Sequence, residues 1–148
     1  MKFNLKITTM ILILCIQPVL AATPAVEHYP PSGDMELPFS EAVRVGHMLY
    51  LSGQIGVDYT TSKLVQGGIA GETRQALENI KTTLVKHGSS MAEVVKCTVF
   101  LADISEWAAM NAVYVTYFKI DPPARSAFGS SGLALGARTE IECIATVK

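Results

Sequence analysis

Residues 94–101 read Val94-Val-Lys-Cys-Thr-Val-Phe-Leu101, a run rich in β-branched side chains, which favours a strand. Successive side chains of a strand point to opposite faces of its sheet. One face is expected to carry Val95, Cys97, Val99 and Leu101, and the other Val94, Lys96, Thr98 and Phe100.

Segments with helical periodicity lie on both sides of this strand. Between Gly67-Gly68 and Gly88, apolar residues form one helix face made of Ile69, Ala76, Leu77, Ile80, Leu84 and Val85. A second helix is expected to start near Asp103 and to stop before Asp121-Pro122-Pro123. Its apolar stripe is Trp107, Met110, Tyr114, Tyr117 and Phe118.

Four further strands complete the pattern. Residues 41–45 and 48–52 flank Gly46-His47, which suits a hairpin turn, and residues 124–129 and 138–147 follow the second helix. The order ββαβαββ predicts an α+β domain with a mixed sheet and both helices on one face. The other face would be too apolar for water, so we expect self-association.

The N-terminus is typical of a secretory signal peptide, residues 1–21. Lys2 and Lys6 precede an apolar core at residues 7–16, and small residues occupy the required positions of Val19-Leu20-Ala21. The core is too short to span a bilayer comfortably, since a membrane helix needs about 20 apolar residues.

The sequence therefore predicts an exported protein, periplasmic or secreted, that leaves the membrane once the signal is removed. A leader without a core of its own, residues 22–37, would precede one domain, residues 38–148. A retained N-terminal anchor is the alternative; a lipoprotein at Cys15 is less favoured, because Leu14 stands where a small residue is required.

Charge and cysteines narrow the function classes. The formal net charge is −1, and removing the two lysines of the signal makes it −3, so there is no general attraction to nucleic acid. Cys97 and Cys143 remain, and an oxidising compartment would permit a disulfide between them. Their places in alternating strands favour the simpler reading of two small buried hydrophobic residues.

Common catalytic motifs are absent from the sequence. His28, His47 and His87 are scattered without metal-ligand spacing, so no metal is expected. The serines lie in no Gly-x-Ser-x-Gly elbow, and Gly129-Ser-Ser-Gly132 lacks the lysine and helix start of a phosphate loop. No cofactor site is predicted.

The remaining candidate is the pair of segments Pro122-Pro-Ala-Arg-Ser126 and Glu140-Ile-Glu-Cys-Ile-Ala145. Arg125 opens one strand, while Glu140 and Glu142 share a face of the next. Taken alone, such charges are most often solvated or paired with each other.

These two segments resemble the closing signatures of the reactive-intermediate imine deaminases, the RidA family. Other segments match in the same order: Leu51-Ser-Gly-Gln-Ile55, Thr73-Arg-Gln-Ala-Leu-Glu-Asn-Ile80, residues 94–101 and Asn111-Ala-Val-Tyr114. The resemblance covers about Pro38 to Val147. It implies a chorismate-mutase-like α+β fold, a homotrimer with sites in the clefts between subunits, and cofactor-free hydrolysis of 2-imino acids of the 2-iminopropanoate and 2-iminobutanoate type to 2-keto acids and ammonia.

The resemblance also implies residue roles. Arg125 matches the arginine that holds the substrate carboxylate, for which a planar guanidinium offers two parallel donors. Glu140 matches the glutamate that positions or activates the attacking water. Ser52, Gly53 and Asn111 match pocket residues, while Glu142 is expected to be a structural or rim acid.

Two pocket positions depart from the family pattern: Phe39 replaces a common tyrosine, and Ala127 replaces a common cysteine. The tyrosine change removes a hydroxyl donor, and the cysteine change enlarges the pocket. A binding module that captures a small carboxylate without turnover is therefore the alternative function. A ribonuclease, ascribed to some members of the family, is disfavoured by the charge.

Overall fold

The computed structural model describes residues 23–31 and 37–148; the expected signal peptide and residues 32–36 lie outside them. The strands are β1 (Val26–Tyr29), β2 (Ala42–Val45), β3 (Met48–Leu51), β4 (Gln54–Ile55), β5 (Val57–Asp58), β6 (Lys63–Leu64), β7 (Val94–Leu101), β8 (Ala124–Gly129) and β9 (Thr139–Thr146). The helices are α1 (Gly68–Lys86) and α2 (Trp107–Tyr114), with short 3₁₀ helices η1 (Met91–Glu93), η2 (Ile104–Glu106) and η3 (Ala134–Gly136).

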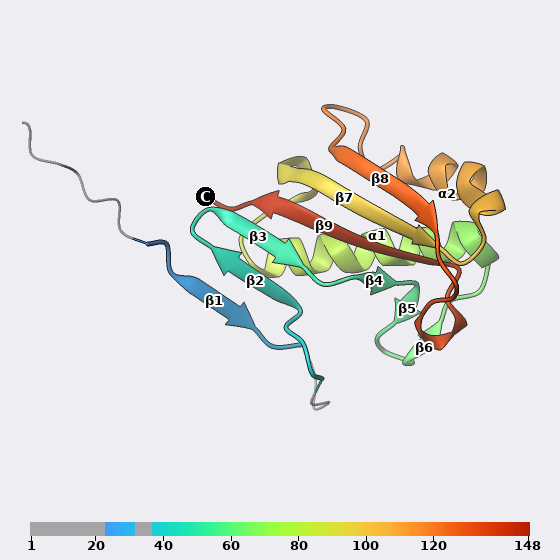
Figure 1. The fold of residues 1–148 in the computed structure, drawn as a ribbon, viewed down its shortest axis with the longest axis horizontal. Helices are drawn as coiled ribbons and strands as arrows, with labels where there is room; N and C mark the ends of the chain where they lie inside the picture. The colour runs from blue at the N-terminus through green and yellow to red at the C-terminus, as the bar shows by residue number, and fades with distance from the viewer. Residues whose placement is uncertain (1–22, 32–36) are drawn as a thin grey trace, which may run out of the picture.

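The predicted mixed sheet is confirmed. Its strands run in the order β1-β2-β3-β9-β7-β8, with β4 also paired to β9, while β5 and β6 form a separate small pair. Strands β7 and β8 pair in parallel; the other pairings among the described strands are antiparallel. Helix α1 lies across one face of the sheet, with α2 beside it (Figure 1).

Helix α1 fills most of the space under the sheet. Its buried residues include the predicted Ile69, Ala76, Leu77, Ile80 and Leu84. Val85 was expected on this face, but its side chain is 63% exposed, because one residue beyond Leu84 turns the side chain about 100° away from the core. Gly67 before the helix and Gly88 after it have positive φ angles, of 106° and 76°, which glycine adopts without steric cost.

Helix α2 is shorter than the helix that the apolar stripe predicted. The turn η2 precedes it, where the Asp103 carboxylate accepts a hydrogen bond from the Ser105 amide at 2.8 Å. The helix stops at Tyr114, so Tyr117 lies in the turn that follows and Phe118 comes directly after that turn. Phe118 is nevertheless buried against the ring of Tyr114, with centroids 4.7 Å apart.

Strand β7 departs from simple alternation at its start. The pairing with β9 shifts between Val94 and Lys96, which is the signature of a β-bulge. Val94 is therefore buried and Val95 is 42% exposed, the reverse of the prediction. From Cys97 onward the predicted faces are correct.

The leader contains a strand that its sequence pattern did not predict. Strand β1 adds to the sheet edge beside β2. At its end the Tyr29 ring stacks on His87, with centroids 4.1 Å apart, and the Glu41 carboxylate bonds the His87 ring at 2.7 Å. Three of the four residues of β1 are exposed, so backbone pairing with β2, rather than burial of apolar side chains, holds β1 to the sheet.

Cys97 and Cys143 form a disulfide between β7 and β9, which corrects the favoured reading of two unlinked hydrophobic residues. The register places the two residues directly opposite each other, with Cα atoms 4.1 Å apart. Both are buried. Alternation along each strand could be predicted from sequence, but the register between strands could not.

The sheet face opposite the helices carries exposed aromatic residues. Tyr50 and Phe128 are 44% and 45% exposed, and Phe128 makes an edge contact with Phe100 at 5.0 Å between centroids. This face, the open face of the sheet, also carries the charged residues Lys96, Glu140 and Glu142. Among the described residues, no helix is long and apolar enough to cross a membrane.

Candidate active site

Arg125 lies on β8, at the edge of the sheet. It pairs directly with Cys97 of β7, so its side chain leaves the sheet on the helix side, as the buried Cys97 does. The guanidinium carbon then lies 4.5 Å from the ring centroid of Tyr114 and 5.5 Å from that of Trp107, both on α2. In the described part of the chain Arg125 has no salt-bridge or hydrogen-bond partner.

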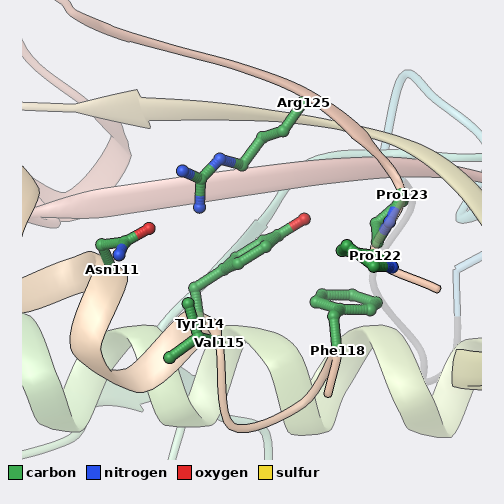
Figure 2. A pocket seen from close by; sticks show the side chains of 7 residues that line it. All are labelled: Asn111, Tyr114, Val115, Phe118, Pro122, Pro123 and Arg125. Carbon is green, nitrogen blue, oxygen red and sulfur yellow. The ribbon is translucent and has the colours of Figure 1, made fainter. Parts of the chain in front are cut away.

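A pocket of about 210 Å³ opens beside Arg125. Figure 2 shows the guanidinium above the Tyr114 ring, with the Asn111 side chain on one side and the two prolines on the other. The lining residues are Asn111, Tyr114, Val115, Phe118, Pro122, Pro123 and Arg125. One cation, one amide and one hydroxyl in an otherwise apolar hollow suit a small organic anion.

Tyr114 contributes a buried hydroxyl to this region. The residue is 4% exposed, and its hydroxyl has no hydrogen-bond partner among the described residues. Burial raises the pKa of Tyr114 to about 12, and the positive charge of Arg125 offsets only part of that rise. The hydroxyl is therefore neutral at physiological pH.

Glu140 lies on β9 opposite Phe100 of β7, and so projects from the open face. Burial raises the pKa of Glu140, and the negative charge of Glu142, on the same face, raises it further. A carboxylate with a raised pKa is a stronger base when it is ionised.

Gly53 lies against the carboxylate of Glu140, and Ser52 precedes Gly53 in the chain. A Cβ atom at Gly53 would overlap the Oε1 atom of Glu140, so the absence of a side chain gives the carboxylate its place. The Ser52 hydroxyl donates a hydrogen bond of 2.6 Å to the Ser40 carbonyl oxygen, which ties the segment after β3 to the chain before β2.

The predicted residues form two groups rather than one. Arg125, Asn111 and Ala127 lie on the helix side, since Ala127 pairs with the buried Val99. Glu140 lies on the open face, with Gly53 beside it. A single chain therefore does not bring Arg125 and Glu140 together.

The remaining predicted positions differ in exposure and contacts. Phe39 precedes β2 and is 53% exposed, and Ala127 packs against the core without lining the pocket. No cluster of three or more potential metal ligands occurs among residues 23–31 and 37–148.

Sequence reasoning missed the aromatic surroundings of Arg125. Trp107 and Tyr114 were assigned only to the stripe of the second helix. Their spacing of seven residues places them two turns apart on one face, but the contact with Arg125 depends on how α2 docks beside β8. No local sequence signal reports that docking.

Comparison with known proteins identifies the family of the chain. A family model described as Endoribonuclease L-PSP matches residues 32–147. The chain is 45% identical over 108 residues to the human 2-iminobutanoate/2-iminopropanoate deaminase, covering 73% of this chain and 79% of the human protein. The chain belongs to the RidA family.

Solved structures of the RidA family extend the likeness to the fold. RidA from an Antarctic Psychrobacter bacterium is 35% identical, with a TM-score of 0.72, and the match covers 86% of this chain and all of that one. Escherichia coli TdcF, solved with bound serine, is 32% identical with a TM-score of 0.72, over 77% of this chain and 91% of that one. These matches confirm the family and the α+β fold expected from the sequence.

Proposed function

We propose that this protein hydrolyses 2-imino acids to 2-keto acids and ammonia. The observation that carries the proposal is Arg125, a cation without an acidic partner in the described chain, held beside a small apolar pocket. The names of the curated relatives, 2-iminobutanoate/2-iminopropanoate deaminase, support the same reaction.

Substrate binding in this proposal rests on Arg125. The substrate carboxylate would accept two parallel hydrogen bonds from the guanidinium. The apolar lining, which includes Val115, Phe118 and Pro123, would take the carbon side chain. Because Arg125 holds the substrate carboxylate, the C=N carbon next to that carboxylate occupies a fixed place in the pocket. The attacking water can therefore be held in one position for the reaction.

Glu140 would supply the base. Its carboxylate takes a proton from water as the water oxygen bonds to the C=N carbon, and the nitrogen keeps the electron pair of the broken π bond. The proton then passes from Glu140 to that nitrogen. As the C–N bond breaks and the C=O bond forms, Glu140 takes the hydroxyl proton of the intermediate and delivers it to the departing ammonia. One iminium ion and one water thus give one keto acid and one ammonium ion.

The two groups of site residues would meet between subunits. Because Arg125 and Glu140 leave opposite sides of the sheet, a complete site requires Glu140 from one chain and Arg125 from another. We therefore include a homotrimer with intersubunit sites in the proposal. The exposed aromatic residues of the open face, including Tyr50 and Phe128, supply an apolar surface for such an assembly.

Export is also proposed. The signal-like residues 1–21 indicate it, and the Cys97–Cys143 disulfide supports it, because disulfides persist mainly in oxidising compartments. An exported deaminase requires a source of imino acids outside the cytoplasm, such as amino-acid oxidation there.

The first test measures ammonia or keto-acid release from 2-iminopropanoate generated in place by an amino-acid oxidase. The wild-type protein is compared with Arg125→Ala, Glu140→Ala and the control Lys63→Ala, whose residue lies on β6 outside both groups. We expect acceleration that the first two variants lose and the control keeps. Full activity in Arg125→Ala would refute the assigned roles, and no rate above the spontaneous one would favour the carboxylate-binding module.

A further inference from the structure

Two aromatic side chains of α2 contact the guanidinium of Arg125. Its central carbon lies 4.5 Å from the Tyr114 ring centroid and 5.5 Å from the Trp107 ring centroid, distances within the range of cation–π contacts. Figure 2 shows the guanidinium over the Tyr114 ring, at the pocket that this ring also lines.

Cation–π contacts of this kind are compatible with hydrogen bonding by the N–H groups of a guanidinium. An aromatic face attracts the cation through the flat face of the guanidinium, while the N–H donors lie in the guanidinium plane and point outward. Within the described residues no carboxylate holds Arg125 in place. Some other contact must fix its long side chain, since an unfixed arginine loses rotamer entropy on each binding event.

We propose that Trp107 and Tyr114 form an aromatic clamp that orients Arg125 for the substrate carboxylate, and that the two rings are positioning residues of the reaction. This inference rests on the proposed function. It assigns the role to the rings themselves and not to the Tyr114 hydroxyl.

Core packing alone does not account for Trp107. Its side chain is 40% exposed, whereas Met110, one turn further along α2, is fully buried and supplies the core contact. A large aromatic residue held half in solvent beside a cation contributes little to the core, and the contact with Arg125 gives it a function.

The clamp predicts an optical signal. Trp107 is the only tryptophan in the chain, so all tryptophan emission comes from the clamp. Titration with 2-oxobutanoate, a stable carboxylate of the product class, is expected to change this emission in the wild-type protein and not in Arg125→Ala. If calorimetry detects binding of 2-oxobutanoate and the tryptophan emission does not change, the clamp proposal is wrong.

Kinetics of ring variants test the same proposal. Trp107→Leu and Tyr114→Leu are expected to raise KM for 2-iminopropanoate, each between about twofold and about thirtyfold, with kcat nearly unchanged, because the carboxylate is bound equally in the ground and transition states. Trp107→Phe and Tyr114→Phe keep a ring and should restore most of the affinity.

Val113→Ala is the matched structural control. Val113 is buried on the same helix, so this variant should lower the melting temperature and leave KM unchanged. Leucine variants with wild-type KM, or a rise in KM matched by Val113→Ala, would overturn the clamp while the deaminase proposal stands. Full activity in Arg125→Ala would instead refute the proposed function.

Discussion

Two influences change the pKa of Glu140 in the same direction. Its partial burial and the neighbouring Glu142 both favour the protonated carboxyl and raise the pKa. A general base works only when it is ionised, so this pKa is expected to set the acidic limit of the reaction.

Removal of the Glu142 charge tests this limit. In Glu142→Gln the pKa of Glu140 should fall towards its ordinary value, and the acidic limb of the kcat/KM profile should move to lower pH. Glu93→Gln is the control, because Glu93 lies on η1, near Lys148, and should leave the profile unchanged. A limb that stays fixed or moves to higher pH in Glu142→Gln would contradict the assignment of Glu140 as the base.

At the residue level the sequence was most informative where motifs are local. Arg125 and Glu140 stand in short segments that resemble the RidA family, and that resemblance selected both; their roles stay a prediction. The Trp107 contact and the hydrogen bond from Ser52 to Ser40 could not be foreseen in this way, because each joins residues whose proximity depends on tertiary packing.

Strands β7 and β9 show what can be predicted for an element and what cannot. Alternation identified the buried side of β7 from Cys97 onward, because a strand with one buried side has a period of two. The bulge at Val94 and Val95 broke that period and reversed two residues. Predicting the disulfide would have required the register between β7 and β9, which neither segment encodes by itself.

The disulfide should make a measurable contribution to stability. Cys97 and Cys143 are 46 residues apart in sequence, and closing a loop of that length in the unfolded chain stabilises the fold by about 4 kcal/mol in the chain-entropy model. We expect Cys97→Ala/Cys143→Ala to lose roughly 2–4 kcal/mol of unfolding free energy in urea.

Reduction provides the control for this measurement. Dithiothreitol should bring the wild-type protein close to the stability of the double variant and leave the double variant unaffected. Equal stability of oxidised and reduced wild type would show that the cross-link contributes nothing.

At the scale of the whole molecule, the open face and the separated site residues point to the same requirement. Self-association was predicted from the apolar strand pattern, and exposed Tyr50 and Phe128 are consistent with it. The sequence analysis did not predict that Arg125 and Glu140 leave opposite sides of the sheet. The side depends on the register of β8 and of β9 against β7, which pairs Arg125 with Cys97 and Glu140 with Phe100.

Mixed assemblies test the intersubunit site directly. Arg125→Ala and Glu140→Ala, each inactive alone, are unfolded together in equal amounts and refolded. We expect about one quarter of the wild-type activity, the chance that a given cleft joins an intact arginine to an intact glutamate. Zero activity from mixed assemblies that sedimentation shows to be trimeric would place the whole site within one chain.

In the proposed mechanism, an acid and an arginine on opposite sides of one sheet would make catalysis a collective property. A solitary chain would fold yet carry no complete site, so activity per milligram should fall when the protein is diluted below the dissociation constant of its assembly. For a protein released into a large extracellular volume, the reaction would then be confined to places where the chains remain concentrated.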